Sequence, residues 1–206
     1  ASGEHLGGVA AATRETILLL EAAGFNTILV ETVGVGQSET AVHNITDVFL
    51  LLLLAGAGDE LQGIKRGIME MADIIVINKA DGDNIPKSKI ALGEVTRALH
   101  LFQEKNSGWT TSVDLCSAAT GAGIPELWDK LNAYKNFTTQ NGYFAEKRSA
   151  QYLNWFHEYL NLAILDRFSK NADFKEKLNT YTQKVENAEM LPPAAVQALL
   201  DGFFTS

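Results

Sequence analysis

Short continuous runs of apolar residues alternate, along the first two thirds of the chain, with segments whose apolar residues recur every three or four positions. Continuous runs are typical of strands that are buried on both faces of a parallel sheet. They lie at residues 27–30, 48–54, 73–77 and 113–116. The second pattern predicts helices, for example over residues 9–23 and around Leu92, Val95 and Leu99. Strands that alternate with helices predict an α/β fold, with a parallel sheet and helices on both of its faces.

The pattern changes near residue 141, beyond which no further strand is predicted. Apolar and aromatic residues between 152 and 168 cover more of a helix than the single face by which a surface helix packs. Two more helices follow, the second of them after a Pro-Pro pair. We therefore predict a sheet domain over residues 1–140 and an all-helical arm over 141–206, which packs partly on the sheet domain and partly on another subunit. The alternative is a helical subdomain of a monomer, but exposed aromatic surface of this extent favours a homodimer.

Composition and charge argue against several classes of protein. Of the 206 residues, 46% are hydrophobic and 20% are charged, as in globular rather than disordered chains. The chain has 17 Lys and Arg against 25 Asp and Glu, and the formal charge of −8 argues against nucleic acid as a partner. The longest apolar run, residues 48–55, is far shorter than the roughly 20 residues of a membrane span, so we expect no membrane partner. The single cysteine, Cys116, fits a reducing, cytoplasmic compartment.

The sharpest candidate for chemistry is the tetrad Asn-Lys-Ala-Asp at residues 78–81, directly after a predicted strand. It matches the N-K-x-D pattern of guanine-specific nucleotide-binding proteins. The Asp81 carboxylate can accept hydrogen bonds from N1–H and from the 2-amino group of guanine, whereas adenine offers neither donor. Asn78 can brace the loop and reach the other edge of the base, and the stem of Lys79 can lie over the base plane. The alternative is a plain polar turn after a strand.

Two further elements follow predicted strands and point to the same ligand. Residues 31–34 resemble the D-x-x-G motif of GTPases, with Glu31 in place of Asp. Glu31 would hold a water on Mg²⁺, and the Gly34 N–H would meet the γ-phosphate. Ser117 and Ala118 resemble the S-A-x element whose backbone N–H contacts guanine O6. Because parallel sheets bind ligands at the carboxyl ends of their strands, these elements predict a site for GTP or GDP with Mg²⁺.

Two loops that contain glycine are candidates for switches. Gln37 is a candidate for orienting the attacking water, although it is also explained as a loop amide with a local hydrogen bond. Gly56 and Gly58 suit a mobile switch, although the same loop is also explained as a connection in which Asp59 caps the next helix. The four histidines lack the spacing of metal ligands and are expected to be structural.

Over longer stretches the chain resembles the MeaB/ArgK family of GTPases. The resemblance is carried by residues 13–39, 56–65 and 78–83, and it extends over nearly the whole chain. It implies the G domain of a P-loop NTPase, with dimerisation through C-terminal helices. It also implies a chaperone in which GTP binding and hydrolysis gate the cofactor loading and protection of an adenosylcobalamin-dependent acyl-CoA mutase, chiefly methylmalonyl-CoA mutase. In a eukaryote the resemblance implies the mitochondrial matrix.

Two switches of the family map onto this sequence. The second switch of the family would fall on residues 31–39. A further switch, which communicates with the mutase, would fall on residues 56–65. Its candidate residues are Gly56, Gly58, Asp59, Glu60, Gln62 and Lys65.

One element of the family pattern does not occur in these 206 residues, which contain no G-x-x-x-x-G-K-[ST] sequence. That P-loop supplies the backbone cradle for the β-phosphate, a phosphate-binding lysine and a hydroxyl ligand for Mg²⁺. Its strand would lie between those at 27–30 and 48–54. We therefore expect the chain to be the C-terminal part of a longer GTPase. The alternatives are a degenerate paralogue or adaptor that does not hydrolyse GTP, and a related metal-insertion GTPase, which would need exposed Cys or His ligands.

Overall fold

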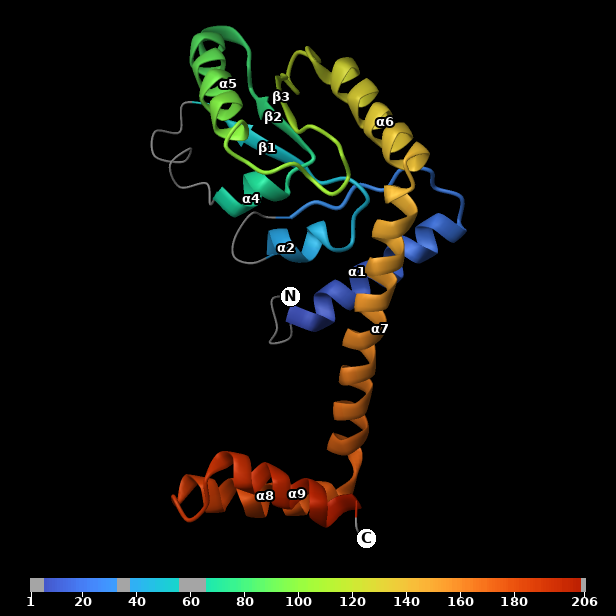
Figure 1. Cartoon of the computed structure of the whole chain (residues 1–206), viewed down its shortest axis with the longest axis vertical. Helices are drawn as coiled ribbons and strands as arrows, with labels where there is room; N and C mark the ends of the chain where they lie inside the picture. The colour runs from blue at the N-terminus through green and yellow to red at the C-terminus, as the bar shows by residue number, and fades with distance from the viewer. Residues whose placement is uncertain (1–5, 33–37, 56–65, 205–206) are drawn as a thin grey trace. The chain divides into compact units, whose positions relative to one another are not determined.

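The computed structural model describes residues 6–32, 38–55 and 66–204 (Figure 1). The chain divides into two compact units, Ala1–Tyr152 and Leu153–Ser206. The first unit contains, in chain order, α1 (Leu6–Ala22), α2 (Ser38–His43), β1 (Leu50–Leu54), α4 (Arg66–Met71), β2 (Ile74–Asn78), the 3-10 turn η1 (Gly82–Asn84), α5 (Ile85–Leu99), β3 (Ser112–Leu115), α6 (Ile124–Gln140) and the beginning of α7 (Tyr143–Lys170).

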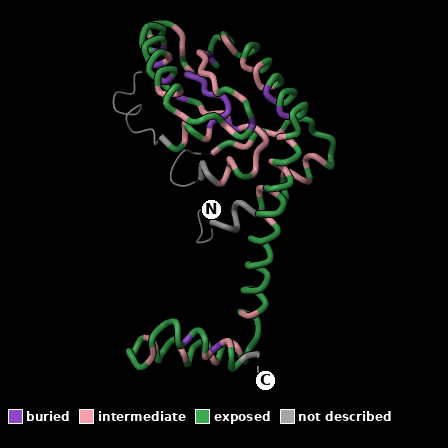
Figure 2. Tube along the Cα trace, in the orientation of Figure 1, coloured by how far each residue is buried: buried purple, intermediate pink, exposed green. Residues whose placement is uncertain are grey.

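The three strands form a parallel sheet in the order β1-β2-β3, as the apolar runs predict. Leu52 of β1 lies opposite Val76 of β2, and Val76 lies opposite Asp114 of β3. The central strand is the most deeply buried, since its residues Ile74 to Ile77 have no exposed surface. Figure 2 shows this burial concentrated on the sheet. All three strands therefore end at the same edge, where the sequence places its candidate binding residues.

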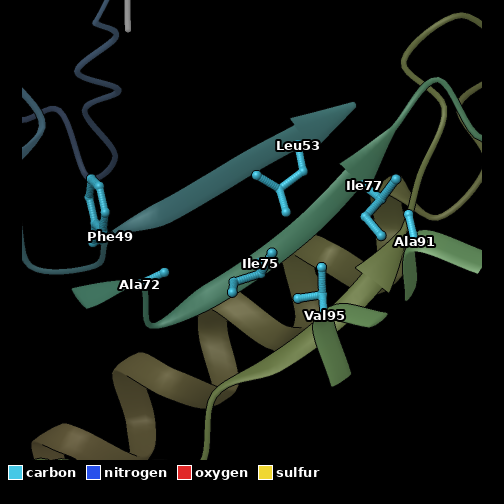
Figure 3. Close-up of a cluster of buried hydrophobic side chains, with 7 residues drawn as sticks. All are labelled: Phe49, Leu53, Ala72, Ile75, Ile77, Ala91 and Val95. Carbon is cyan, nitrogen blue, oxygen red and sulfur yellow. The ribbon is translucent and has the colours of Figure 1, made fainter. Parts of the chain in front are cut away.

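Helices cover both faces of the sheet, which confirms the predicted α/β architecture. Successive side chains of a strand point to opposite faces. Ile75 and Ile77 accordingly pack with Ala91 and Val95 of α5, as Figure 3 shows, and residues of α2 and α4 complete that cluster. On the other face Ile74 and Val76 pack with Tyr134 of α6. Each face of β2 thus has its own apolar cluster.

The strand predicted at residues 27–30 is not formed, and that prediction is wrong for this chain. Residues 25–32 are irregular, and Leu29 is 88% exposed. A strand needs a neighbour for its backbone N–H and C=O groups, and in the described part of the chain β1 pairs with β2 alone. Leu52 of β1 is 58% exposed. The apolar pattern of residues 27–30 thus suits a strand, but no partner strand is present among the described residues.

The first turns of α7 are fastened to the sheet unit by polar side chains. Lys147 Nζ donates to the Asp47 carbonyl at 2.9 Å. Arg148 donates from Nε and Nη2 to the Asp47 carboxylate at 2.7 and 2.6 Å, and its Nη2 also lies 2.8 Å from Glu21 Oε1 of α1. Gln151 donates to the Thr46 carbonyl at 3.0 Å. The segment between α2 and β1 is therefore held directly by α7.

The second unit consists of helices only: the remainder of α7, α8 (Ala172–Glu186) and α9 (Pro192–Phe204). Asn171 begins α8 as a side-chain cap, accepting from the Phe174 N–H at 3.0 Å. Helices α8 and α9 pack together, with Ala195 and Leu199 buried. Large apolar side chains of α7 are exposed, among them Phe156 and Tyr159, each 59%. Among the described residues, no helix has the length and apolar character needed to cross a membrane.

Candidate functional site

The loops that follow β2 and β3 are joined to each other by backbone hydrogen bonds. The Cys116 N–H donates to the Ile77 carbonyl at 3.0 Å, and the Ala80 N–H donates to the Cys116 carbonyl at 2.9 Å. These bonds continue the pairing of β2 and β3 past the ends of the strands. They place residues 78–81 beside residues 117 and 118, which is the juxtaposition that the sequence predicts.

Asn78 braces the two loops through its side-chain oxygen. Asn78 Oδ1 accepts from the Lys79 N–H at 2.7 Å and from the Ala118 N–H at 3.1 Å. The Cys116 Sγ lies 3.5 Å from the same oxygen. An acceptor shared by both loops explains why an amide side chain stands here, because the oxygen collects backbone donors and leaves the NH₂ group for another partner.

Asp81 is fixed by the loop after β3. Its Oδ2 accepts a hydrogen bond from Ser117 Oγ, and Ser117 is completely buried. Ser117 Oγ also accepts from the Thr120 N–H at 3.2 Å, so its own hydrogen is committed to Asp81. In the part of the chain that the structure describes, Asp81 Oδ1 takes no protein hydrogen bond. The carboxylate is therefore held in place while one oxygen remains open to a ligand.

The loop of residues 117–123 is held tightly against the end of β3. The Ser117 N–H donates to the Ala122 carbonyl and the Gly121 N–H to the Ser117 carbonyl, each at 2.8 Å. Gly123 has φ 75°, and a Cβ at this position would lie 2.3 Å from the Leu115 carbonyl oxygen. Only glycine fits this approach.

The remaining candidate residues are not brought to these loops by the structure. Glu31 is described but lies exposed in irregular chain, and it makes no hydrogen bond or ion pair with another residue of the described ranges. The other candidates lie outside the described residues. They are Gly34, Gln37, Gly56, Gly58, Asp59, Glu60, Gln62 and Lys65. The candidate residues that lie together in the structure are thus Asn78, Lys79, Asp81, Ser117 and Ala118. Their role in nucleotide binding stays a prediction.

A second polar cluster, which the sequence analysis does not predict, lies at the opposite end of the strands. Asp73 precedes β2 and is 4% exposed; it accepts from the Phe49 N–H at 2.9 Å and from Lys105 Nζ at 3.2 Å. Lys147 Nζ lies 3.8 Å from the same carboxylate. Burial lowers the pKa of both lysines, and Asp73 partly offsets it. The partners are far apart in sequence, so no local pattern could have revealed the cluster.

Comparison with known proteins matches residues 1–173 to a family described as methylmalonyl-CoA mutase-associated GTPase MeaB. A probable GTPase of Mycobacterium tuberculosis is 43% identical over 95% of this chain and 58% of its own length. The GTPase ArgK of Escherichia coli is 40% identical over 96% of this chain and 60% of its own length. A mitochondrial mouse protein, the methylmalonic aciduria type A homolog, is also 40% identical, over 96% of this chain and 48% of its own length.

A solved structure gives the same result for the fold. The crystal structure of a LAO/AO transport system kinase matches with a TM-score of 0.73 and 37% identity, covering 97% of this chain and 64% of that one. The chain thus spans about half to three fifths of the length of these curated relatives.

Proposed function

Because this chain belongs to the family of methylmalonyl-CoA mutase-associated GTPases MeaB, we propose that its natural protein binds and hydrolyses GTP as the chaperone of an adenosylcobalamin-dependent acyl-CoA mutase. In this proposal the nucleotide state gates the loading of the cofactor and protects the mutase. The observation that carries the nucleotide part is the joining of the loops after β2 and β3, through Asn78 Oδ1 and through Asp81 with Ser117.

The donor and acceptor set of these loops fits a guanine base. Asp81 keeps an open carboxylate oxygen, and each carboxylate oxygen can accept more than one hydrogen bond, so N1–H and the 2-amino group can both be met. The exposed Lys79 has a stem long enough to lie over a base plane. The Ala118 N–H is donated to Asn78 Oδ1 in this structure. It must therefore share or exchange that bond to donate to guanine O6.

The phosphate end of the proposed site rests on the family resemblance. Glu31 would hold a water on Mg²⁺, Gly34 would meet the γ-phosphate, and Gln37 would orient the attacking water. Magnesium would neutralise charge that develops on the phosphate oxygens. Residues 1–206 contain no P-loop sequence, and phosphates supply most of the contacts of a bound nucleotide. We expect GTP to bind residues 1–206 alone more weakly than micromolar, as measured by calorimetry with Mg²⁺.

The proposed partners are a mutase and a second copy of the chain. The mutase would be met by the further switch at residues 56–65, with Gly56, Gly58, Asp59, Glu60, Gln62 and Lys65 as the candidate residues. The second copy would cover the exposed apolar side chains of α7, such as Phe156, Tyr159 and Leu165. We propose a cytoplasmic location, or the mitochondrial matrix in a eukaryote.

The test compares the natural protein with its Asp81→Ala variant. Phosphate release from GTP and from ATP is measured with and without the candidate mutase, and binding of each nucleotide is measured by calorimetry. We expect GTP hydrolysis in the wild type, little ATP hydrolysis, and loss of the GTP activity in the variant. As a matched control, Asp83→Asn changes an exposed acid two residues away and should leave hydrolysis unchanged. GTP binding without hydrolysis would favour the non-hydrolysing adaptor, and binding of neither nucleotide would refute the proposal.

The metal-insertion alternative would need metal ligands such as exposed Cys or His side chains. In the described ranges, no group of three or more His, Cys, Asp or Glu side chains is arranged to hold a metal ion.

A further inference from the structure

The backbone of Lys79 adopts a conformation that disfavours residues with a Cβ. Its φ is 59°, and within the described part of the chain only Lys79 and Ala188 combine a side chain with a positive φ. Lys79 lies in the middle of the proposed guanine-reading loop. Contacts around it must therefore compensate for the unfavourable backbone conformation.

Three hydrogen bonds hold the peptide groups on either side of Lys79, and one of them is the bond from the Ala80 N–H to the Cys116 carbonyl described above. The Lys79 N–H donates to Asn78 Oδ1 at 2.7 Å, and the Lys79 carbonyl accepts from Asn84 Nδ2 at 2.8 Å. Asn84 is itself fixed, because its N–H donates to the Asp81 carbonyl at 3.0 Å and its carbonyl accepts from Ser88 Oγ at 3.0 Å. Ser88 is completely buried in α5. The loop is thus closed upon itself through Asn84 and anchored to a helix.

The side chain of Asn84 is not used as an ordinary helix cap. Asn84 stands at the N-cap position of α5, where an Asn side chain usually accepts from an N–H of the first turn. Here the side chain makes no capping bond, and its NH₂ group donates back to the Lys79 carbonyl. An Asp at this position has nearly the same shape, but it has no hydrogen to donate to that carbonyl. The position therefore makes use of a property that separates Asn from Asp.

We propose that Asn84 is a positioning residue for guanine recognition. It holds Lys79 in the left-handed conformation and so aims the Lys79 stem and the Asp81 carboxylate at the base. The inference rests on the proposed function of this site. Asn84 acts through Lys79 and need not touch the nucleotide. Without its hydrogen bond, the peptide between Lys79 and Ala80 keeps only the bond from the Ala80 N–H to the Cys116 carbonyl, and Asp81 is held less firmly.

The base selectivity of the site is the property that this role controls. Hypoxanthine lacks the 2-amino group of guanine, so GDP and IDP differ by one of the two donors that Asp81 would accept. If Asp81 is held less firmly, the preference of the site for GDP over IDP should decrease. A general weakening of the fold or of the phosphate contacts would instead lower the affinities for GDP and IDP equally.

The experiment measures Kd for GDP and for IDP in the full natural protein and in two variants. The first is Asn84→Ala. The second exchanges neighbours, Asp83→Asn with Asn84→Asp, which keeps the net charge and nearly the size of the side chain at position 84 but removes the donor. Loss of one hydrogen bond should raise the Kd for GDP by about 3- to 10-fold and the Kd for IDP by less than about 2-fold. Asp83→Asn alone is the control and should change neither value.

Thermal unfolding of each variant is measured as well, and affinities are compared at a temperature at which every variant is fully folded, which separates positioning from stability. If Asn84→Ala fails to fold, the exchange variant decides alone. Unchanged GDP affinity, or equal losses for GDP and IDP, would overturn the role of Asn84. A wild-type protein that does not distinguish GDP from IDP would instead overturn the proposed guanine recognition, and the inference with it.

Discussion

Replacing Asp81 by Asn tests guanine recognition, because it exchanges one acceptor oxygen of the side chain for an NH₂ donor. Ser117 Oγ accepts from the Thr120 N–H and donates to Asp81 Oδ2. In the Asp81→Asn variant the amide oxygen should keep this bond to Ser117, because the hydroxyl hydrogen has no better acceptor in the loop. The NH₂ group is then directed to the open side, where the guanine 2-amino group would lie. The variant should therefore present a donor where the base also presents a donor.

The cost follows from the lost acceptor and the new donor–donor contact. A hydrogen bond to a charged group contributes about 1.5–3 kcal/mol, and an unsatisfied donor adds to the loss. We expect a total of about 2–4 kcal/mol, or roughly 30- to 1,000-fold weaker GTP binding. Xanthine carries a carbonyl in place of the 2-amino group. The same variant should therefore gain affinity for XTP.

The assay is competition of GTP and XTP for a fluorescent guanine nucleotide in the full natural protein. Asp83→Asn removes one negative charge from an exposed acid nearby and serves as the matched control for electrostatics. Its affinities should stay within about 2-fold of the wild type, since surface charges contribute little. GTP binding by Asp81→Asn as tight as that of the wild type would refute the assignment of Asp81 to the base.

Three further predictions concern stability and assembly. Gly123→Ala should lower the free energy of unfolding in urea by about 2–4 kcal/mol, because the added Cβ would collide with backbone atoms. Gly121→Ala is the control and should lower it by only about 1 kcal/mol, since Gly121 also has a positive φ but no atom within 4 Å of the added Cβ. Equal losses in the two variants would contradict the close approach at Gly123. Trp155→Glu together with Tyr159→Glu should convert the proposed dimer to a monomer in light scattering, and an unchanged dimer would remove α7 from the interface. Burial, with the nearby Lys147 charge, lowers the pKa of His43, so the unfolded chain takes up a proton and stability should fall as pH drops below about 6.5. In His43→Phe the melting temperature should therefore fall less between pH 7 and 5 than in the wild type. An identical fall would exclude His43 as the cause.

The strands and the candidate binding loops could be predicted because their signals are local. Continuous apolar runs at 48–54, 73–77 and 113–116 correspond to β1, β2 and β3 within two residues at each end. The tetrad at 78–81 directly follows the central strand, so its position at the edge of the sheet follows from the parallel topology.

Features that depend on distant partners could not be predicted in the same way. The run at 27–30 has a strand pattern, but whether it forms a strand depends on a neighbour that no property of those residues reveals. Asp73 gains its buried position from Lys105 and from Lys147, which lie far along the chain. The role of Asn84 depends on the left-handed backbone at Lys79, which the residue types at these positions do not reveal.

The edge position of β1 has a consequence for handling residues 1–206 as an isolated protein. Within the described ranges, β1 is an outer strand made of five consecutive leucines, with no charged or proline residue to block pairing with another chain. Uncharged outer strands of this composition are templates for intermolecular β-pairing and aggregation. Concentrated samples should therefore form assemblies through the sheet as well as through the helices. Leu52→Lys, at an exposed position of the outer strand, should suppress the sheet-mediated assemblies and leave the proposed helical dimer intact.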